Sequence, residues 1–205
     1  MPSENMVKSY IGNMIETIGT YTIKLNNENF NITTDAIELV NFMLKDDISV
    51  GDILEIGAGS GYISFKLYGY NKNIVAVEIQ KDVFKLLEKN IRVNNLKIKA
   101  INEDIIKYEG KFDYIISNPP YYKLESGKYP KNEVVKNSKF ETLLNLENIC
   151  KKIYSFLKSD KSKFYLVYPI YRKEEVKKEI LKNNLKIIRE QQTAKLYFVC
   201  GSKKN

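Results

Sequence analysis

The clearest regularity along the chain is an alternation of short apolar runs with longer amphipathic segments between residues 53 and 200. Apolar runs of about four to eight residues are typical of buried strands, whereas apolar positions that recur every three or four residues are typical of helices. By these rules we predict strands over residues 53–56, 74–79, 98–102, 112–117, 164–169, 185–190 and 196–200. We predict helices over residues 63–70, 82–93, 142–157 and 173–183.

Strands that alternate with helices in this way indicate an α/β fold, with a mostly parallel seven-stranded sheet and helices on both faces. Ahead of it, alternating runs at 20–25 and 30–33 predict a β-hairpin that turns at Asn26–Asn29. Asp35, followed three residues later by Glu38, predicts the start of a further helix. The 205 residues suit one domain, with an N-terminal hairpin and helix extension over 1–50 and a core over 51–205.

Residues 121–140 follow neither period. A segment of about twenty residues without periodic structure inside a compact domain is usually functional. Two tyrosines, Tyr122 and Tyr129, lie among its five lysines, which are Lys123, Lys128, Lys131, Lys136 and Lys139. Basic and aromatic side chains together suit contacts with nucleic acid. A solvated surface loop is the simpler alternative.

Composition excludes several classes of chemistry. Hydrophobic residues make up 43% of the chain, enough to bury a core. We find no secretory signal and no apolar run of the roughly 18 residues that a membrane span needs. There are two cysteines, without CxxC spacing, and no histidine. We therefore expect a cytoplasmic monomer with free thiols, no metal site, no membrane partner and no histidine-based catalysis.

The charge is distributed unevenly. Residues 1–110 hold 12 basic and 15 acidic side chains, whereas residues 111–205 hold 21 and 10. A basic half favours a polyanionic partner such as RNA, because lysines near phosphates release counterions on binding. An A/T-rich genome also raises the lysine content, but it should do so evenly along the chain.

A glycine-rich turn comes directly after the first strand of the predicted core. Residues 55–61 read Glu-Ile-Gly-Ala-Gly-Ser-Gly, so that Gly57, Gly59 and Gly61 alternate behind Glu55. Glycines let the backbone approach a ligand at the carboxyl end of a strand, and the next helix offers N–H groups to an anion. A dinucleotide site would place the third glycine one residue later. The pattern resembles the first motif of class I methyltransferases that use S-adenosylmethionine (SAM), although an NAD site or a simple tight turn would also explain glycines here.

Two acidic residues follow the next two strands. Glu78 lies 21 residues beyond Gly57, where a carboxylate can accept hydrogen bonds from both hydroxyls of a ribose. Asp104 follows the third strand and could accept the amino group of the cofactor's adenine. The alternatives are an exposed acid at a strand end for Glu78 and a cap of the next segment for Asp104.

The sequence Asn118-Pro119-Pro120-Tyr121 follows the fourth strand. The lone pair of an adenine amino group is delocalised, so the nitrogen is a poor nucleophile. The Asn118 side-chain oxygen and the Pro119 carbonyl could accept its two N–H groups and point the lone pair at the methyl group of SAM. Tyr121 could stack on the base. A rigid loop would explain the prolines, but not their place at the same edge as the glycine turn.

Together these motifs resemble class I SAM-dependent methyltransferases of the NPPY type, which have a Rossmann-like fold. The resemblance is closer to the bacterial tRNA(Val) adenine-N6 methyltransferases, on three features: Thr34-Asp35-Ala36, the lysine-bearing loop and little added sequence at either end. In that family the loop carries an arginine-histidine-glutamate run, whereas the matching residues 137–141 read Asn-Ser-Lys-Phe-Glu.

The resemblance implies SAM as cofactor and RNA, with tRNA first, as substrate. It implies catalysis by Asn118, Pro119 and Tyr121. The cofactor would be bound by Glu55, Gly57, Gly59, Gly61, Glu78, Asp104 and Asn118. The RNA would be contacted by Tyr122, Lys123, Lys128 and Lys131.

Three other functions compete with this interpretation. Protein glutamine methyltransferases also use NPPY, but they carry a helical domain before the SAM fold, and here about fifty residues with a hairpin precede Asp52. A DNA adenine methyltransferase would need a target-recognition domain. A non-catalytic RNA-binding protein that keeps the SAM fold is the alternative outside enzymes, and the intact glycines, Glu78 and Asn118 disfavour it.

Overall fold

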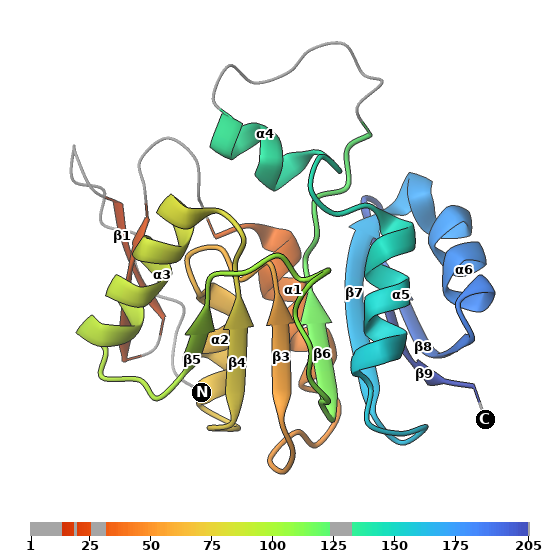
Figure 1. Ribbon diagram of the computed structural model, residues 1–205, viewed down its shortest axis with the longest axis horizontal. Helices are drawn as coiled ribbons and strands as arrows, with labels where there is room; N and C mark the ends of the chain where they lie inside the picture. The colour runs from red at the N-terminus through yellow and green to blue at the C-terminus, as the bar shows by residue number, and fades with distance from the viewer. Residues whose placement is uncertain (1–13, 19, 26–31, 124–132, 205) are drawn as a thin grey trace.

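The structure, a computed structural model, describes residues 14–18, 20–25, 32–123 and 133–204. Its main sheet is built from the strands β3 (Ile53–Ile56), β4 (Ile74–Val77), β5 (Lys99–Ile101), β6 (Tyr114–Ser117), β7 (Lys163–Pro169), β8 (Leu185–Gln192) and β9 (Leu196–Lys203). Their order is β5-β4-β3-β6-β7-β9-β8 (Figure 1). The first five in that order are parallel, and β9 is antiparallel to both β7 and β8. The predicted seven-stranded, mostly parallel sheet is therefore confirmed.

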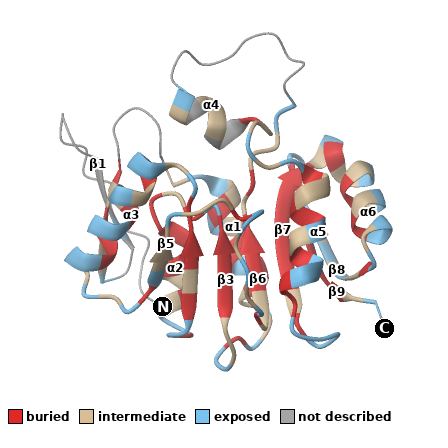
Figure 2. Ribbon diagram, in the orientation of Figure 1, coloured by how far each residue is buried: buried red, intermediate tan, exposed pale blue. Residues whose placement is uncertain are grey.

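Helices cover both faces of this sheet. They are α1 (Thr34–Met43), α2 (Tyr62–Tyr68), α3 (Lys81–Val93), α5 (Leu146–Phe156) and α6 (Lys173–Lys182). A further helix, α4 (Glu133–Lys139), lies beyond the ends of the strands. One core cluster joins α1, α2 and α3 to the sheet, and a second joins α5 and α6 to the other face. Figure 2 shows the central strands β3, β4, β6 and β7 buried between these two layers. All four residues of β3 are buried, which explains why its sequence is a continuous apolar run around Glu55 rather than an alternating one.

The hairpin forms with a different strand from the one predicted. β1 (Met14–Ile18) pairs antiparallel with β2 (Tyr21–Leu25), so the hairpin lies on the N-terminal side of β2. Of the expected second strand, Ile32 and Thr33 lie outside any strand, and the expected turn at 26–29 lies outside the described residues. The prediction was wrong because two polar segments flank β2, and sequence alone does not show which of them reverses the chain.

Two asparagines, Asn90 in α3 and Asn94 at its C-terminal cap, occupy the other edge of β2. The Asn94 amide accepts from Thr22 N (2.8 Å) and donates to Thr22 O (2.7 Å). The Asn90 amide accepts from Lys24 N and donates to Lys24 O, both at 3.0 Å. Asparagines one helical turn apart thus bond alternate residues of β2 as a neighbouring strand would. Asn90 Nδ2 also donates to Ser60 O (3.0 Å), which ties the hairpin to the glycine turn.

Two local predictions need correction. Helix α1 is capped by Thr33, whose Oγ1 accepts from Ala36 N at 3.3 Å, and Asp35 lies within the first turn. Thr33 has the extended backbone of a cap residue, which the sequence pattern did not reveal. The aperiodic segment 121–140 contains α4, which stands over the carboxyl ends of the parallel strands (Figure 1).

Candidate active site

A cavity of about 530 Å³ lies at the carboxyl ends of β3, β4 and β6. This is the point where the strand order reverses, the usual ligand position in an open α/β sheet. Its lining comes from the glycine turn, the ends of β4 and β5, the start of α1, the segment 118–122 and α4. Volumes of about 300–1,000 Å³ are typical of small-molecule sites, so the space suits a cofactor with part of a second substrate.

The three glycines of the turn have two different structural roles. Gly57 (φ 73°) and Gly59 (φ 57°) line the cavity, and a Cβ added to either would have no atom within 4 Å. Gly61 (φ 98°) is not part of the cavity lining, and its Cβ would come within 2.8 Å of Leu87 on α3. The left-handed backbone of Gly57 and Gly59 therefore leaves space for a ligand. A Cβ at Gly61 would collide with Leu87, so this glycine lets α2 pack against α3, and its predicted cofactor contact stays a prediction.

Substitutions at Gly59 and Gly61 should have different effects. Gly59→Val is expected to abolish measurable SAM binding, because the side chain projects into the open space of the cavity and also strains the left-handed backbone at this position. Gly61→Ala should instead destabilise the fold by about 1–3 kcal/mol through overpacking against Leu87. Calorimetric titration with SAM and urea unfolding of both variants would separate the two effects. Unchanged SAM affinity in Gly59→Val would refute this placement of the cofactor.

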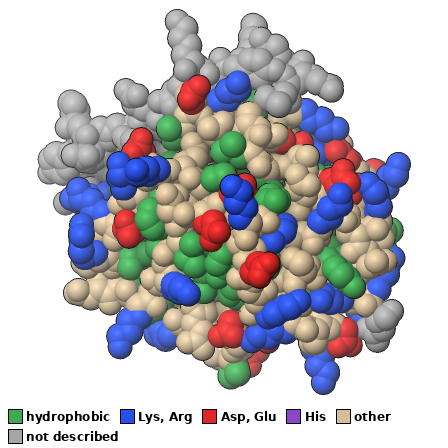
Figure 3. Space-filling view, viewed as in Figure 1, with side chains coloured by type: hydrophobic (Ala, Val, Ile, Leu, Met, Phe, Trp, Pro, Cys, Tyr) green, Lys and Arg blue, Asp and Glu red, His purple; other side chains and the backbone are tan. Residues whose placement is uncertain are grey.

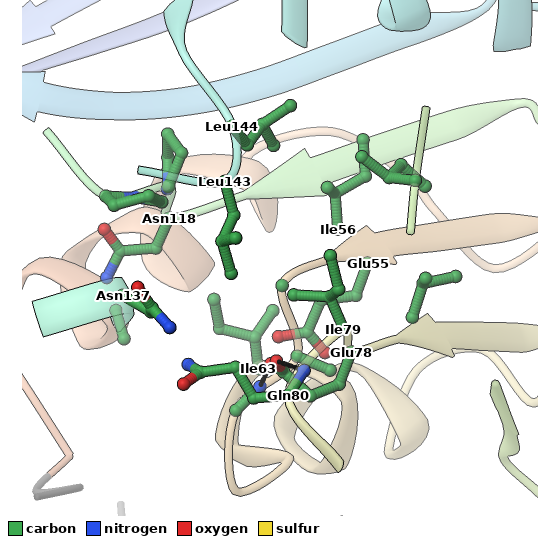
Figure 4. Close-up of a pocket in the computed structure, with 18 of the residues that line it drawn as sticks. Glu55, Ile56, Ile63, Glu78, Ile79, Gln80, Asn118, Asn137, Leu143 and Leu144 are labelled. Atoms are coloured by element: carbon green, nitrogen blue, oxygen red, sulfur yellow. Dashed lines mark hydrogen bonds between the residues drawn. The ribbon is translucent and has the colours of Figure 1, made fainter. Parts of the chain in front are cut away.

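Glu78 is held by backbone groups on both sides. It is buried just beyond β4, where Oε2 accepts from Gly59 N (3.0 Å) and Oε1 accepts from Gln80 N (2.8 Å). Burial raises the pKa of this carboxyl, while the backbone N–H groups of Gln80 and Gly59 oppose the rise. Each oxygen keeps a further acceptor position, so the carboxylate can receive two hydroxyl groups from a ligand in the cavity. Figure 4 shows Glu78 close to Gln80 and Ile79 on the wall that β4 provides.

Glu55 has its main partner within the protein. Its Oε2 accepts from Ser64 N at 2.9 Å and also from Ser64 Oγ, linking β3 to α2. The side chain borders the cavity but is 1% exposed. Burial, with a smaller contribution from Glu78, raises the pKa of the Glu55 carboxyl to about 8. Glu55 thus positions the helix that follows the glycine turn.

The raised pKa of Glu55 makes stability depend on pH. The folded state holds this proton up to about pH 8, whereas an unfolded glutamate loses it near 4.5. The contribution of Glu55 to stability is therefore complete below pH 4.5 and is lost as pH rises towards 8, by at most about 1.4 kcal/mol per pH unit. Glu55→Gln should remove this slope in urea-unfolding curves of the SAM-free protein. Glu109→Gln, at an exposed site, is the control. Parallel pH curves for wild type and Glu55→Gln would contradict the assignment.

Asp104 caps a turn and also borders the cavity, while its predicted contact with the cofactor's adenine stays a prediction. Its Oδ1 accepts from Ile106 N (2.9 Å), which caps the local turn, and the residue also lines the cavity. Nearby Asn102 donates to Glu78 O (2.7 Å) and Ile79 O (3.1 Å), and so holds the ends of β4 and β5 together. Sequence reasoning assigned no role to Asn102, because these carbonyls follow a different strand, β4.

The segment from Asn118 to Tyr122 forms the opposite wall of the cavity. The Tyr121 hydroxyl donates to Asp35 Oδ2 at 3.1 Å, so α1 fixes the orientation of that ring. Burial, followed by the charge of Asp35, raises the pKa of Tyr121, which keeps it a neutral phenol. Tyr122 is partly exposed, with its ring centroid 4.9 Å from that of Tyr121.

Two residues of this wall were not predicted as site residues. Asp35 comes from α1 and Asn137 from α4, and both line the cavity. Thr142 Oγ1 donates to Asn137 Oδ1 (2.9 Å), which leaves the amide N–H groups of Asn137 for other acceptors. Figure 4 shows Asn118 and Asn137 side by side at one end of the cavity. The Asp35 and Asn137 segments entered the family resemblance, but no periodicity indicated that their side chains meet Asn118.

The lysines predicted to contact RNA are only partly covered by the structure. Lys123 forms an ion pair with Glu175 (3.2 Å) and is not among the residues that line the cavity. Lys128 and Lys131 lie outside the described residues.

Residues 22–140, more than half of the chain, match the family model of the methyltransferase small domain. The chain belongs to this family. Its fold is that of class I SAM-dependent methyltransferases, and its cofactor is SAM. The open space beside Gly57 and Gly59 and the held carboxylate of Glu78 fit such a cofactor.

Relatives of this methyltransferase differ in their named substrates. A protein of Methanocaldococcus jannaschii named as a protein N5-glutamine methyltransferase is 36% identical over 53% of this chain and 55% of its own length. The release factor glutamine methyltransferase of Lactococcus lactis is 34% identical over 48% and 38%. The tRNA1(Val) (adenine(37)-N6)-methyltransferase of a Flavobacteriaceae bacterium is 31% identical over 50% and 46%. The alignments thus span about half or less of each relative.

Solved structures confirm the fold of this methyltransferase. Methanocaldococcus jannaschii TYW2, in complex with AdoMet, superposes with a TM-score of 0.63 at 19% identity, over 97% of this chain and 89% of that one. The ribosomal protein L11 methylase of Lactobacillus delbrueckii subsp. bulgaricus gives a TM-score of 0.66 at 15% identity, over 84% and 81%.

Two kinds of feature are absent from the described residues. No helix among them is both long and apolar enough to cross a membrane. Within the same residues, no three side chains of the metal-binding types cluster to hold an ion.

Proposed function

We propose that this methyltransferase methylates the N6 amino group of an adenine in RNA, with tRNA as the first candidate. The observation that carries the proposal is that one cavity connects the glycine turn and Glu78 with Asn118 and Tyr121. A methyl donor on the first wall and a planar amino group on the second would face each other across it.

The cofactor half of the proposal rests on three groups. Gly57 and Gly59 would lie against the methionine part of SAM, where the turn leaves open space. Glu78 would accept the two ribose hydroxyls with the oxygen positions that its backbone donors leave free. Asp104 would accept the adenine amino group of the cofactor. SAM, when bound, supplies an electrophilic methyl group on a sulfonium.

The acceptor half rests on the Asn118 segment. Asn118 Oδ1 and the Pro119 carbonyl would each accept one N–H of the target amino group, which favours a tetrahedral nitrogen with its lone pair towards the cofactor. Tyr121 would stack on the base, in the orientation that its bond to Asp35 holds. SAM would supply the methyl group, the N–C bond replacing the S–C bond of the sulfonium, and the methylated nitrogen would lose its proton to water afterwards. No base has to act first, which suits a chain without histidine.

Charge supports a nucleic acid as the substrate. Residues 111–205 carry 21 basic against 10 acidic side chains. Figure 3 shows Lys and Arg side chains spread over one face with Asp and Glu among them. We propose that Tyr122 and Lys123 contact the RNA beside the cavity, with phosphate displacing Glu175 from Lys123.

We also propose that residues 1–50 and 51–205 act as one domain, because α3 holds the hairpin.

Protein glutamine N5-methylation is the second candidate. A glutamine amide is also a planar amino group, and two of the relatives described above carry that activity in their names. The same residues would hold either substrate, with the planar amide of glutamine in the place of the adenine amino group.

The deciding experiment compares acceptors directly. The protein is incubated with isotope-labelled SAM and, separately, with unmodified tRNA, ribosomal RNA and release factor, and the product is identified by mass spectrometry. We expect labelled N6-methyladenosine from tRNA. Labelled N5-methylglutamine in the release factor would overturn the RNA assignment but not the fold or cofactor. SAM binding without transfer to any acceptor would favour a non-catalytic RNA-binding protein.

A further inference from the structure

Arg172 is a buried arginine whose three side-chain nitrogens all have partners. It belongs to a short 3-10 turn, η2 (Ile170–Arg172), directly after β7, and it is 2% exposed. Its Nη1 donates to the carbonyl oxygen of Tyr121 (2.9 Å) and to Glu141 Oε1 (2.7 Å). Its Nε and Nη2 donate to the two carboxylate oxygens of Glu175, at 3.1 and 2.9 Å.

Two of these partners, Tyr121 and Glu141, lie at the two ends of one segment. Tyr121 ends the Asn118 motif, and Glu141 follows the segment that carries α4. The ends are also joined directly, because Glu141 N donates to Tyr122 O (2.9 Å) beside a β-bridge between Tyr122 and Phe140. Arg172 therefore holds the Tyr121 end and the Glu141 end together, next to α4, which stands over the carboxyl ends of the parallel strands (Figure 1).

A lysine could not replace this arrangement. The planar guanidinium presents several N–H groups at fixed angles, so it can bind a carboxylate with two nitrogens while its third serves a carbonyl and a second carboxylate. Two carboxylates compensate the buried charge, and the guanidinium carbon lies 5.2 Å from the centroid of the Tyr168 ring. A buried network in which every donor has a partner is rigid, because one geometry satisfies all of its hydrogen bonds. Removal of one member is costly, because it leaves the others unpaired.

We propose that Arg172 is a positioning residue, which sets the Asn118–Tyr121 wall and α4 at the distance from the glycine turn that methyl transfer requires. This inference rests on the proposed function. It does not depend on whether the acceptor is an adenine or a glutamine. The residue touches the backbone of Tyr121 and not the cavity itself, so its effect should appear in the transfer rate more than in SAM affinity.

The test uses Arg172→Lys and Arg172→Met, with Arg189→Lys as the matched control. Arg189 on β8 also donates to a carbonyl (Phe42 O, 2.9 Å) and to a carboxylate (Asp46, 2.7 Å), but it is absent from the cavity lining. Hydrogen–deuterium exchange of the SAM-bound protein is measured first. It needs no acceptor substrate, so its result stands even if the proposed function fails.

In both Arg172 variants we expect faster exchange in residues 118–123 and 133–142, with the glycine turn still protected. Single-turnover transfer to the acceptor that the wild type methylates should fall about 10²-fold, while the Kd for SAM changes less than about twofold. Lysine should restore little of the rate, and Arg189→Lys should keep it.

Two results would overturn the proposal. One is that Arg172→Lys exchanges hydrogen for deuterium and transfers the methyl group at the same rates as the wild type. The other is a loss of transfer rate with an equal loss of SAM affinity and with faster exchange across the whole sheet. General destabilisation of the fold would produce that result. If the Arg172 variants do not fold, Glu141→Gln tests the same contact from its partner. It should accelerate exchange in residues 133–142, and unchanged exchange there would contradict the proposal.

Discussion

Asn118→Ala is expected to reduce methyl transfer by at least about 10²–10³-fold while the affinity for SAM stays nearly unchanged. The reason is the division of the cavity between two walls. Asn118 lies on the wall opposite Glu78, so its amide oxygen can act on the acceptor amino group without supporting the ribose. Without the Asn118 amide oxygen, one N–H of the target amino group has no hydrogen-bond partner, and the lone pair of its nitrogen stays delocalised into the ring.

The measurement is single-turnover transfer of labelled methyl groups together with calorimetric titration of SAM. Asn183→Ala is a suitable control, because Asn183 Nδ2 donates to Glu179 at the end of α6 and the residue is not part of the cavity lining. An equal loss of transfer and SAM affinity in Asn118→Ala would show that Asn118 holds the cofactor and not the acceptor.

Glu78→Ala is expected to weaken SAM binding about 10²-fold, the second large effect. The variant loses both proposed ribose contacts and also leaves Gly59 N and Gln80 N without their carboxylate. Lost charged hydrogen bonds of this kind cost roughly 1.5–3 kcal/mol each. Because burial raises the pKa of Glu78, the wild type should also lose SAM affinity as pH falls and the carboxyl takes up a proton.

Calorimetry across a pH series checks both parts. Glu190→Gln provides the control, since Glu190 lies on β8 and accepts from Tyr197 rather than from the glycine turn. SAM affinity in Glu78→Ala equal to that of the wild type would place the ribose elsewhere. A wild-type affinity independent of pH would mean that Glu78 stays ionised throughout that range.

Much of the core fold could be predicted from the sequence, because strands that are buried on both faces have continuous apolar sequences. The seven strands of the sheet follow the predicted runs to within a few residues, as β3 and β7 illustrate. The chain order of the glycine turn, Glu78, Asp104 and Asn118 also follows from the sequence. Each comes after a different strand, and the carboxyl ends of parallel strands meet at one edge.

Other contacts required the tertiary structure, because they join residues that are far apart in the chain. Asp35 and Tyr121 meet through the packing of α1, and Arg172 reaches the Tyr121 carbonyl because β7 lies next to β6. The partner of β2 was misassigned because β2 has two edges, and asparagines of α3 occupy the one that a following strand would need. Apolar periodicity determines which residues are buried. Which polar side chains meet is determined by how the helices and strands pack, and that information is not local in sequence.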